Sequence, residues 1–119
     1  MKQEDKLLLI KDLCVRLPYG VKADDRGEII TIRAYHPSGI IDDFGIMHNI
    51  ENIKPYLFPL SSMTEDQSKI YHELIRGMFG TSALINIEEF VDWCNKNHLD
   101  YRGLIEKGLA LDATELNIY

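Results

Sequence analysis

Apolar residues follow two different spacings along this chain, and the change between them predicts two structural halves. Between residues 28 and 47 many apolar positions alternate with polar ones, as on a β-strand. After residue 64 they recur every three or four positions, as on the buried face of a helix. The joining segment, residues 53–64, carries Pro55 and Pro59, which favour an extended backbone. We therefore expect a helix-plus-sheet half over residues 1–60 and a helical half over residues 61–119.

The first half begins with a helical pattern over residues 6–17, which Pro18 and Gly20 end. The stripe that this helix must bury consists of Leu7, Ile10, Leu13, Cys14 and Leu17. Strands follow over residues 21–23, 28–35, 40–47 and 50–57, separated by turn-forming clusters at 24–27 and 36–39. Their short connections favour an antiparallel meander of three to four strands, with one face toward the first helix.

The pattern of residues in the second half predicts two to three helices. Thr64 and Gln67 form a capping-box pattern in front of a helix whose apolar stripe extends from Ile70 to Met78. Asn86 opens a third helix by the same pattern, and residues 101–107 predict a last short helix.

Residues 109–119 are too apolar for a free tail, so we expect part of them to pack on the domain or to meet another subunit. The expected fold class is α+β, in which an N-terminal helix and a small meander are followed by C-terminal helices packed on the sheet.

Length and charge restrict the function classes. A chain of 119 residues suits one domain with one core. The net charge of −6 and the lack of a basic stripe disfavour nucleic acid as a partner. The sequence contains neither an apolar run of the ~20 residues that span a bilayer nor a signal-peptide pattern, so we expect no membrane association. With two cysteines only, a reduced, cytoplasmic protein is expected.

Candidate chemistry is sparse. Cys94 and His98 are four residues apart, a spacing that fits two metal ligands or a nucleophile with its base. A zinc site would need a further ligand such as His72 or Cys14, and the position of Cys94 on an apolar stripe favours a core thiol instead. The acid pairs at 24–25 and 42–43 are interpreted as solvated loop carboxylates. We expect no catalytic residue, no metal and no cofactor.

Three runs of about ten residues carry a resemblance to a protein family. They are residues 13–22 (Leu-Cys-Val-Arg-Leu-Pro-Tyr-Gly-Val-Lys), 53–64 (Ile-Lys-Pro-Tyr-Leu-Phe-Pro-Leu-Ser-Ser-Met-Thr) and 101–111 (Tyr-Arg-Gly-Leu-Ile-Glu-Lys-Gly-Leu-Ala-Leu). In this order they resemble short uncharacterised proteins from prophage and mobile-element regions of gut Bacteroidales. The resemblance implies a bacterial cytoplasm and a phage-derived genome, and it assigns no site residue.

For function we expect a small non-enzymatic module that binds a protein partner or another copy of itself. Aromatic residues anchor such interfaces, so the expected interaction surface includes Tyr56, Phe58, Trp93 and Tyr101. Two alternatives stay open: a nucleic-acid-associated regulator that acts through the C-terminal helices, and a small enzyme that uses Cys94 and His98.

Overall fold

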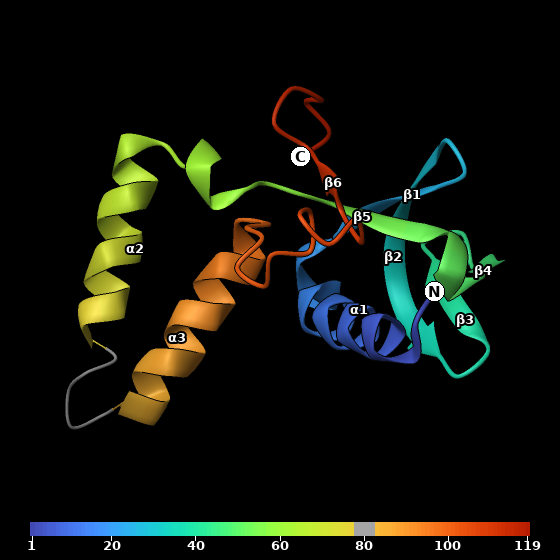
Figure 1. Ribbon diagram of the computed structural model, residues 1–119, viewed down its shortest axis with the longest axis horizontal. Helices are drawn as coiled ribbons and strands as arrows, with labels where there is room; N and C mark the ends of the chain where they lie inside the picture. Colours follow the sequence, from blue (N-terminus) through green and yellow to red (C-terminus); the bar gives the residue numbers. More distant parts are fainter. Residues whose placement is uncertain (78–82) are drawn as a thin grey trace.

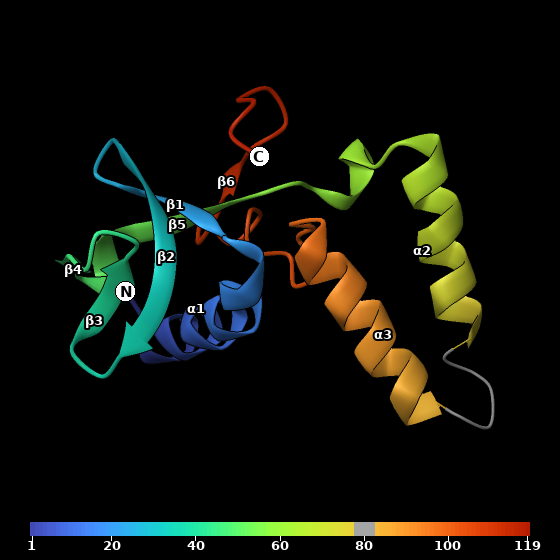
Figure 2. The ribbon, with the colours of Figure 1, turned by 180° about the vertical axis from the view of Figure 1, so that it is seen from behind.

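A six-stranded sheet with helix α1 (Gln3–Arg16) against it forms one end of the molecule, and helices α2 (Glu65–Gly77) and α3 (Ala83–Lys96) extend from it as a hairpin (Figure 1). This computed structural model describes residues 1–77 and 83–119, and the side chains of all of these except 83–86. In the view from behind, α3 lies between α2 and the sheet (Figure 2). The predicted α+β class is confirmed.

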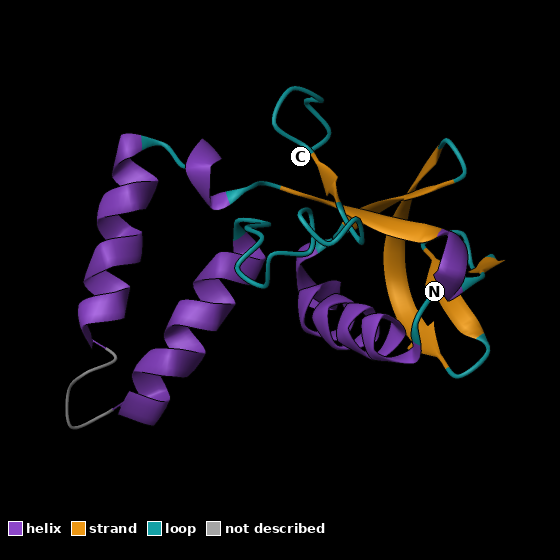
Figure 3. Cartoon of the chain, in the orientation of Figure 1, coloured by secondary structure: helices purple, strands orange, loops and turns teal. Residues whose placement is uncertain are grey.

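Every strand except β2 is short, and in the described part of the chain three single-turn 3₁₀ helices connect strands with their neighbours (Figure 3). The strands are β1 (Lys22–Asp25), β2 (Glu28–His36), β3 (Gly39–Asp42), β4 (Met47–His48), β5 (Ile53–Leu57) and β6 (Leu111–Asp112). The 3₁₀ helices are η1 (Leu17–Tyr19), η2 (Ile50–Asn52) and η3 (Leu60–Ser62). The spatial order of the strands is β4-β3-β2-β1-β5-β6.

The first four strands form the predicted antiparallel meander, with one difference. Arg26 and Gly27 turn β1 into β2 with positive φ angles of 51° and 94°, which matches the right-handed twist of the hairpin. The expected single strand over 40–47 is instead two strands, β3 and β4. The cause is Asp42, whose carboxylate accepts hydrogen bonds from the backbone N–H groups of Phe44 and Ile46 at 2.9 Å each and so folds the chain back.

The expected fourth strand returns to the other side of the sheet. β5 pairs antiparallel with β1 instead of β4, and β6 then pairs parallel with β5. The sheet is therefore mixed, and the prediction of a purely antiparallel meander of three to four strands was wrong in this respect. The prediction that part of 109–119 packs on the domain is confirmed, because β6 lies in this segment and the Tyr119 hydroxyl donates to the carbonyl of Tyr56 at 2.7 Å.

Helix α1 buries a stripe that overlaps the predicted one in part and is rotated from it. Leu9 and Leu13 face the core, whereas Leu7 is 57% exposed. The stripe is rotated because two charged residues on it, Asp12 and Arg16, are also fully buried. A pattern of apolar positions cannot reveal such a pair. The core packed with α1 comprises Val21, Ala23, Ile30, Ile32, Ile40, Ile50, Ile53, Leu57, Leu104, Leu109 and Ala110.

The start of α2 was predicted correctly, and its packing was not. Thr64 and Gln67 exchange reciprocal hydrogen bonds of 3.0 and 3.1 Å, as a capping box requires. However, α2 packs on α3 instead of on the sheet, and none of its described side chains is buried. Met78, the last residue of the predicted stripe, lies outside the described residues.

Two other expectations for the helical half were wrong. Helix α3 begins at Ala83, so Asn86 lies inside it and cannot cap it. Residues 101–107 form turns instead of a helix. Gly103 has a φ of 71°, which no right-handed helix accommodates, and the Asp100 carboxylate accepts the N–H groups of Leu104 and Ile105 at 2.8 and 2.9 Å.

A buried ion pair joins α1 to these turns. Arg16 donates to both carboxylate oxygens of Asp12, at 2.8 and 3.1 Å, and to the carbonyl oxygen of Leu99 at 2.8 Å. Arg102 adds a third hydrogen bond to Asp12, at 3.1 Å. The guanidinium groups of Arg16 and Arg102 lie 5.2 and 5.1 Å from the ring centre of Tyr101. Asp12 therefore accepts hydrogen bonds from both arginines, and its single negative charge balances one of their two positive charges. Both guanidinium groups also lie close to the ring of Tyr101.

The substitution Asp12→Asn should destabilise the fold strongly, because it leaves the fully buried Arg16 without a counter-charge. Breaking one partner of a buried ion pair costs about 3–5 kcal/mol. Urea unfolding followed by circular dichroism measures the loss. The matched control is Asp43→Asn at an exposed carboxylate, which should stay within about 0.5 kcal/mol of the parent. Equal unfolding midpoints for the two variants would contradict the assigned role of Asp12.

Candidate functional site

The cysteine and histidine at the end of α3 are both uncharged at neutral pH. Cys94 is fully buried, and this burial raises the pKa of its thiol to about 11. Burial also lowers the pKa of His98 to about 4, with a further contribution from the positive charges of Arg16 and Lys22. A reactive cysteine needs an accessible thiolate, so the structure favours the interpretation of Cys94 as a core thiol.

A second candidate cluster was not expected from the sequence: His48 lies between two buried carboxylates. Its Nδ1 atom is 2.5 Å from Asp25 Oδ2, and its Nε2 atom is 2.8 Å from Asp42 Oδ2. All three side chains are less than a tenth exposed. The interpretation of the acid pairs as solvated loop carboxylates was therefore wrong for one member of each pair, because Asp25 and Asp42 point into the protein, whereas Asp43 is exposed.

The hydrogen bonds of this cluster define its charge. Ionised carboxylates only accept hydrogen bonds, so both ring nitrogens of His48 must donate, and the ring is an imidazolium. Hydrogen bonds from Asp42 and Asp25 raise the pKa of His48 against the effect of burial. The hydrogen bond to His48 correspondingly lowers the pKa of each carboxyl. With no free lone pair on either nitrogen, His48 cannot serve as a general base, and the cluster holds β1, β3 and β4 together.

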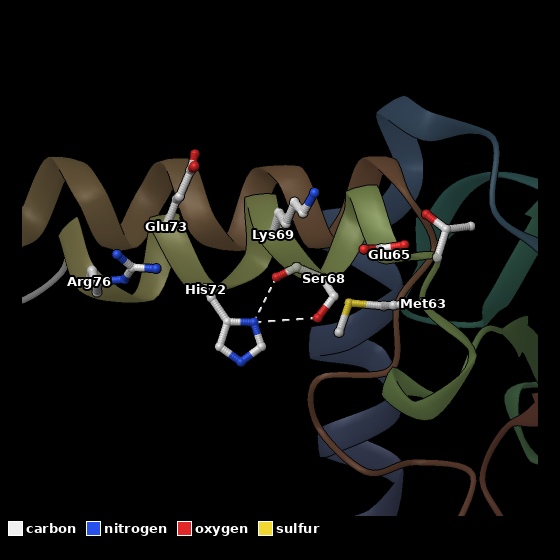
Figure 4. A pocket seen from close by; sticks show the side chains of 8 residues that line it. Met63, Glu65, Ser68, Lys69, His72, Glu73 and Arg76 are labelled. Atoms are coloured by element: carbon white, nitrogen blue, oxygen red, sulfur yellow. Dashed lines mark hydrogen bonds between the residues drawn. The ribbon is translucent and has the colours of Figure 1, made fainter.

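A hollow of about 420 Å³ on the outside of α2 brings a serine beside a histidine (Figure 4). The Ser68 hydroxyl is 3.4 Å from Nδ1 of His72, but the same nitrogen is 2.6 Å from the backbone carbonyl of Ser68. Nδ1 must donate to that carbonyl, so it carries a proton and cannot accept one from the hydroxyl. The pair therefore has the geometry of a helix-surface contact and not that of a nucleophile with its base.

The four aromatic residues expected at an interface lie in different surroundings. Tyr56 is buried on β5. Phe58 packs on Tyr119 with the ring centres 5.8 Å apart, and Tyr101 lies beside the two arginines described above. Trp93 is half-buried on α3. Their joint role as a docking surface stays a prediction.

The most exposed large apolar side chain of the described residues, that of Phe44, lies instead at the edge of the sheet. Among the described residues, strand β4 pairs only with β3, and the loop before it presents Phe44, which is 85% exposed. Ile46 and Met47 are 57% and 47% exposed. In the antiparallel ladder Asp42 N–H donates to the Ile46 carbonyl, so the alternation turns the N–H and C=O groups of Met47 outward. Residues 44–47 contain no charge and no proline, the usual protections of an edge strand.

Comparison with known proteins adds no relative: no protein-family model, no curated protein and no solved structure matches the chain. Within the described ranges, no three His, Cys, Asp or Glu side chains are grouped as a metal site requires. Among the described helices, none combines the length and the apolar character needed to cross a membrane.

Sequence reasoning missed Asp12, Arg16, Asp25, Asp42 and His48. Signals for two of these contacts were nevertheless present. Asp12 and Arg16 are four residues apart on a helix, a spacing that brings opposite charges together. The contact between His48 and Asp42 could also have been inferred, because a hairpin that folds at residues 43–46 places the two residues close together. What the sequence did not show is that these contacts are buried.

The His48 cluster should make stability depend on pH. Because the pKa of His48 is raised in the fold, its contribution is complete below its ordinary value of 6.5 and is lost as pH rises through the raised value. The carboxyl pKa values are lowered, so their contribution is complete above 3.8 and is lost as pH falls through the lowered values. The measurement is urea unfolding of the parent and of His48→Gln at about pH 6 and about pH 9. The advantage of the parent should shrink at the higher pH, and a constant difference would contradict the charged state assigned to His48.

The two cysteines should differ in reactivity. Cys14 is partly accessible, whereas Cys94 is fully buried with a pKa of about 11. Iodoacetamide applied to the native protein should therefore modify Cys14 first, and mass spectrometry of peptides should find Cys94 modified only after unfolding in urea. Alkylation of native Cys94 at the rate of a free thiol would restore the Cys94–His98 enzyme alternative.

Proposed function

We propose that this protein is a non-enzymatic interaction module whose β4 edge binds an extended segment of a protein partner. The observation that supports this proposal is the open edge itself, with its unpaired Met47 backbone groups and the exposed side chains of Phe44 and Ile46. A partner strand that pairs with β4 would satisfy the backbone groups and cover the apolar side chains.

The acids that flank the edge in the sequence favour a particular partner chemistry, and the Arg33 guanidinium beside Gly45 contributes the opposite charge. The exposed carboxylates of Asp43 and Glu51 lie on either side of residues 44–47 in the sequence, and the whole chain carries a charge of −6. An apolar segment with lysine or arginine at its ends complements this arrangement. A second copy of the chain would bring the same acids to the contact, so a different protein is the better partner.

The cellular setting follows from the resemblance of three sequence runs to prophage and mobile-element proteins. In that setting the partner is a bacterial or phage protein in the cytoplasm. The nucleic-acid alternative lacks a comparable observation, since residues 101–107 form no recognition helix and Arg102 is bound to Asp12.

The test uses a peptide of alternating valine and threonine with lysines at both ends, titrated into isotopically labelled protein. The amide signals of residues 46–48 should shift most, because the peptide pairs with β4. Met47→Pro should weaken binding by at least about tenfold, since proline removes the outward N–H group while the hydrogen bonds to β3 remain.

Two controls sharpen this experiment. The sibling peptide with glutamates at its ends should bind about tenfold more weakly if charge complementarity contributes as proposed. The control for Met47→Pro is Lys107→Met, an exposed change outside the sheet, which should leave peptide binding unchanged. A second proline, such as Ile29→Pro, cannot serve as this control because β2 is an interior strand. Equal binding to the parent and Met47→Pro, or shifts that avoid β4, would refute the proposal.

A further inference from the structure

A cleft lies where the two halves of the chain meet. It measures about 490 Å³, within the range of small-molecule sites. Four segments contribute to its walls: the end of β5 with η3, the first turn of α2, the end of α3, and the C-terminal segment. The cleft is far from the β4 edge in sequence and in the strand order, so it is independent of the function proposed above.

Aromatic rings form one wall of this cleft. The rings of His98 and Tyr119 stack with their centres 3.6 Å apart and an angle of 13° between their planes, and Phe58 lies beside Tyr119. The Tyr119 hydroxyl fixes this arrangement, because it donates to the Tyr56 carbonyl and accepts from the backbone N–H of Lys22 at 2.8 Å. Rings held in this way offer apolar faces, tilted by 55° between Phe58 and Tyr119, without the entropic cost of ordering them on binding.

The charge of the lining is unusual for this chain. Although the protein has 19 acidic residues, no Asp or Glu is among the described residues that line the cleft, and Lys96 contributes an ammonium group. The positive charges of Arg16 and Lys22 also act on the His98 ring, whose pKa they help to lower. The local field therefore favours an anion.

One of the residues that line the cleft, His98, has a buried polar atom. Nδ1 of His98 is buried and makes no hydrogen bond within the described part of the chain. Such atoms are rare in native proteins and call for a water or a bound group that completes them. Polar side chains of Gln67 and Asn97 also line the cleft.

We propose that this cleft binds a small planar carboxylate, whose aromatic ring packs against Phe58 and Tyr119 and whose anionic group pairs with Lys96. The aromatic wall selects for the flat ring, and the acid-free lining with one lysine selects for a single negative charge. An uncharged or cationic ligand of the same shape would lack the second of these contacts.

The experiment compares three probes of the same shape: naphthalene carboxylate, naphthalene carboxamide and naphthylmethylammonium. Each is titrated into the labelled full chain, and the dissociation constant is taken from the amide shifts. The carboxylate should bind most tightly and shift residues around 58–67, 96–99 and 114–119. Lys96→Met should weaken the carboxylate by about tenfold and leave the carboxamide unchanged.

Lys96 is exposed, so its substitution should not affect folding, and Lys107→Met provides a matched loss of one surface lysine outside the cleft. Equal affinities for the three probes, equal weakening by the two lysine substitutions, or shifts outside the cleft would each overturn the proposal. Peptide binding to the β4 edge is measured from the amide signals of residues 46–48, which lie outside the cleft. Failure of one proposal can therefore be distinguished from failure of the other.

Discussion

The ion pair between Asp12 and Arg16 is the interaction on which the rest of the structure depends. It lies inside the molecule, and Arg16 also binds the Leu99 carbonyl of the turn that follows α3. Through this one side chain, the first helix is joined to the segment that leads from the helical hairpin back to the sheet. Removing two charges from water is costly, and the cost is offset here by three hydrogen bonds to Asp12 and by the contact of Arg16 with the ring of Tyr101.

The second buried charged cluster has a different consequence, because it lies close to the open edge. His48 is itself a residue of β4, and its two carboxylate partners belong to β1 and β3. A strand of two residues has few backbone hydrogen bonds, so these side-chain contacts hold the edge in place. An edge that is fixed on its inner side and unpaired on its outer side is well suited to accept a partner strand, since little ordering remains to be done on binding.

The features of the fold that were predicted correctly are those that depend on residues close together in the sequence. The capping box at Thr64, the turn at Arg26 and Gly27, and the packing of residues 109–119 each depend on neighbouring residues or on local apolar content, and all three were predicted. The placement of β5 beside β1 and the burial of Asp12 and Arg16 depend on contacts between distant segments, and both were missed. Of the candidate sites, the position of Cys94 in the core was predicted, whereas the Asp25–His48–Asp42 cluster was not, because the acid pairs were interpreted as solvated loop carboxylates.

The capping box and the packing of α2 on α3 together imply unequal local stability along the chain. Because no described side chain of α2 is buried, its opening should require much less free energy than the opening of the sheet. The first turn of α2 also forms part of the wall of the cleft at the junction of the two halves. Partial unfolding of this one helix would therefore widen the cleft while the sheet and its edge stay intact, so the two surfaces can respond to their ligands on different timescales.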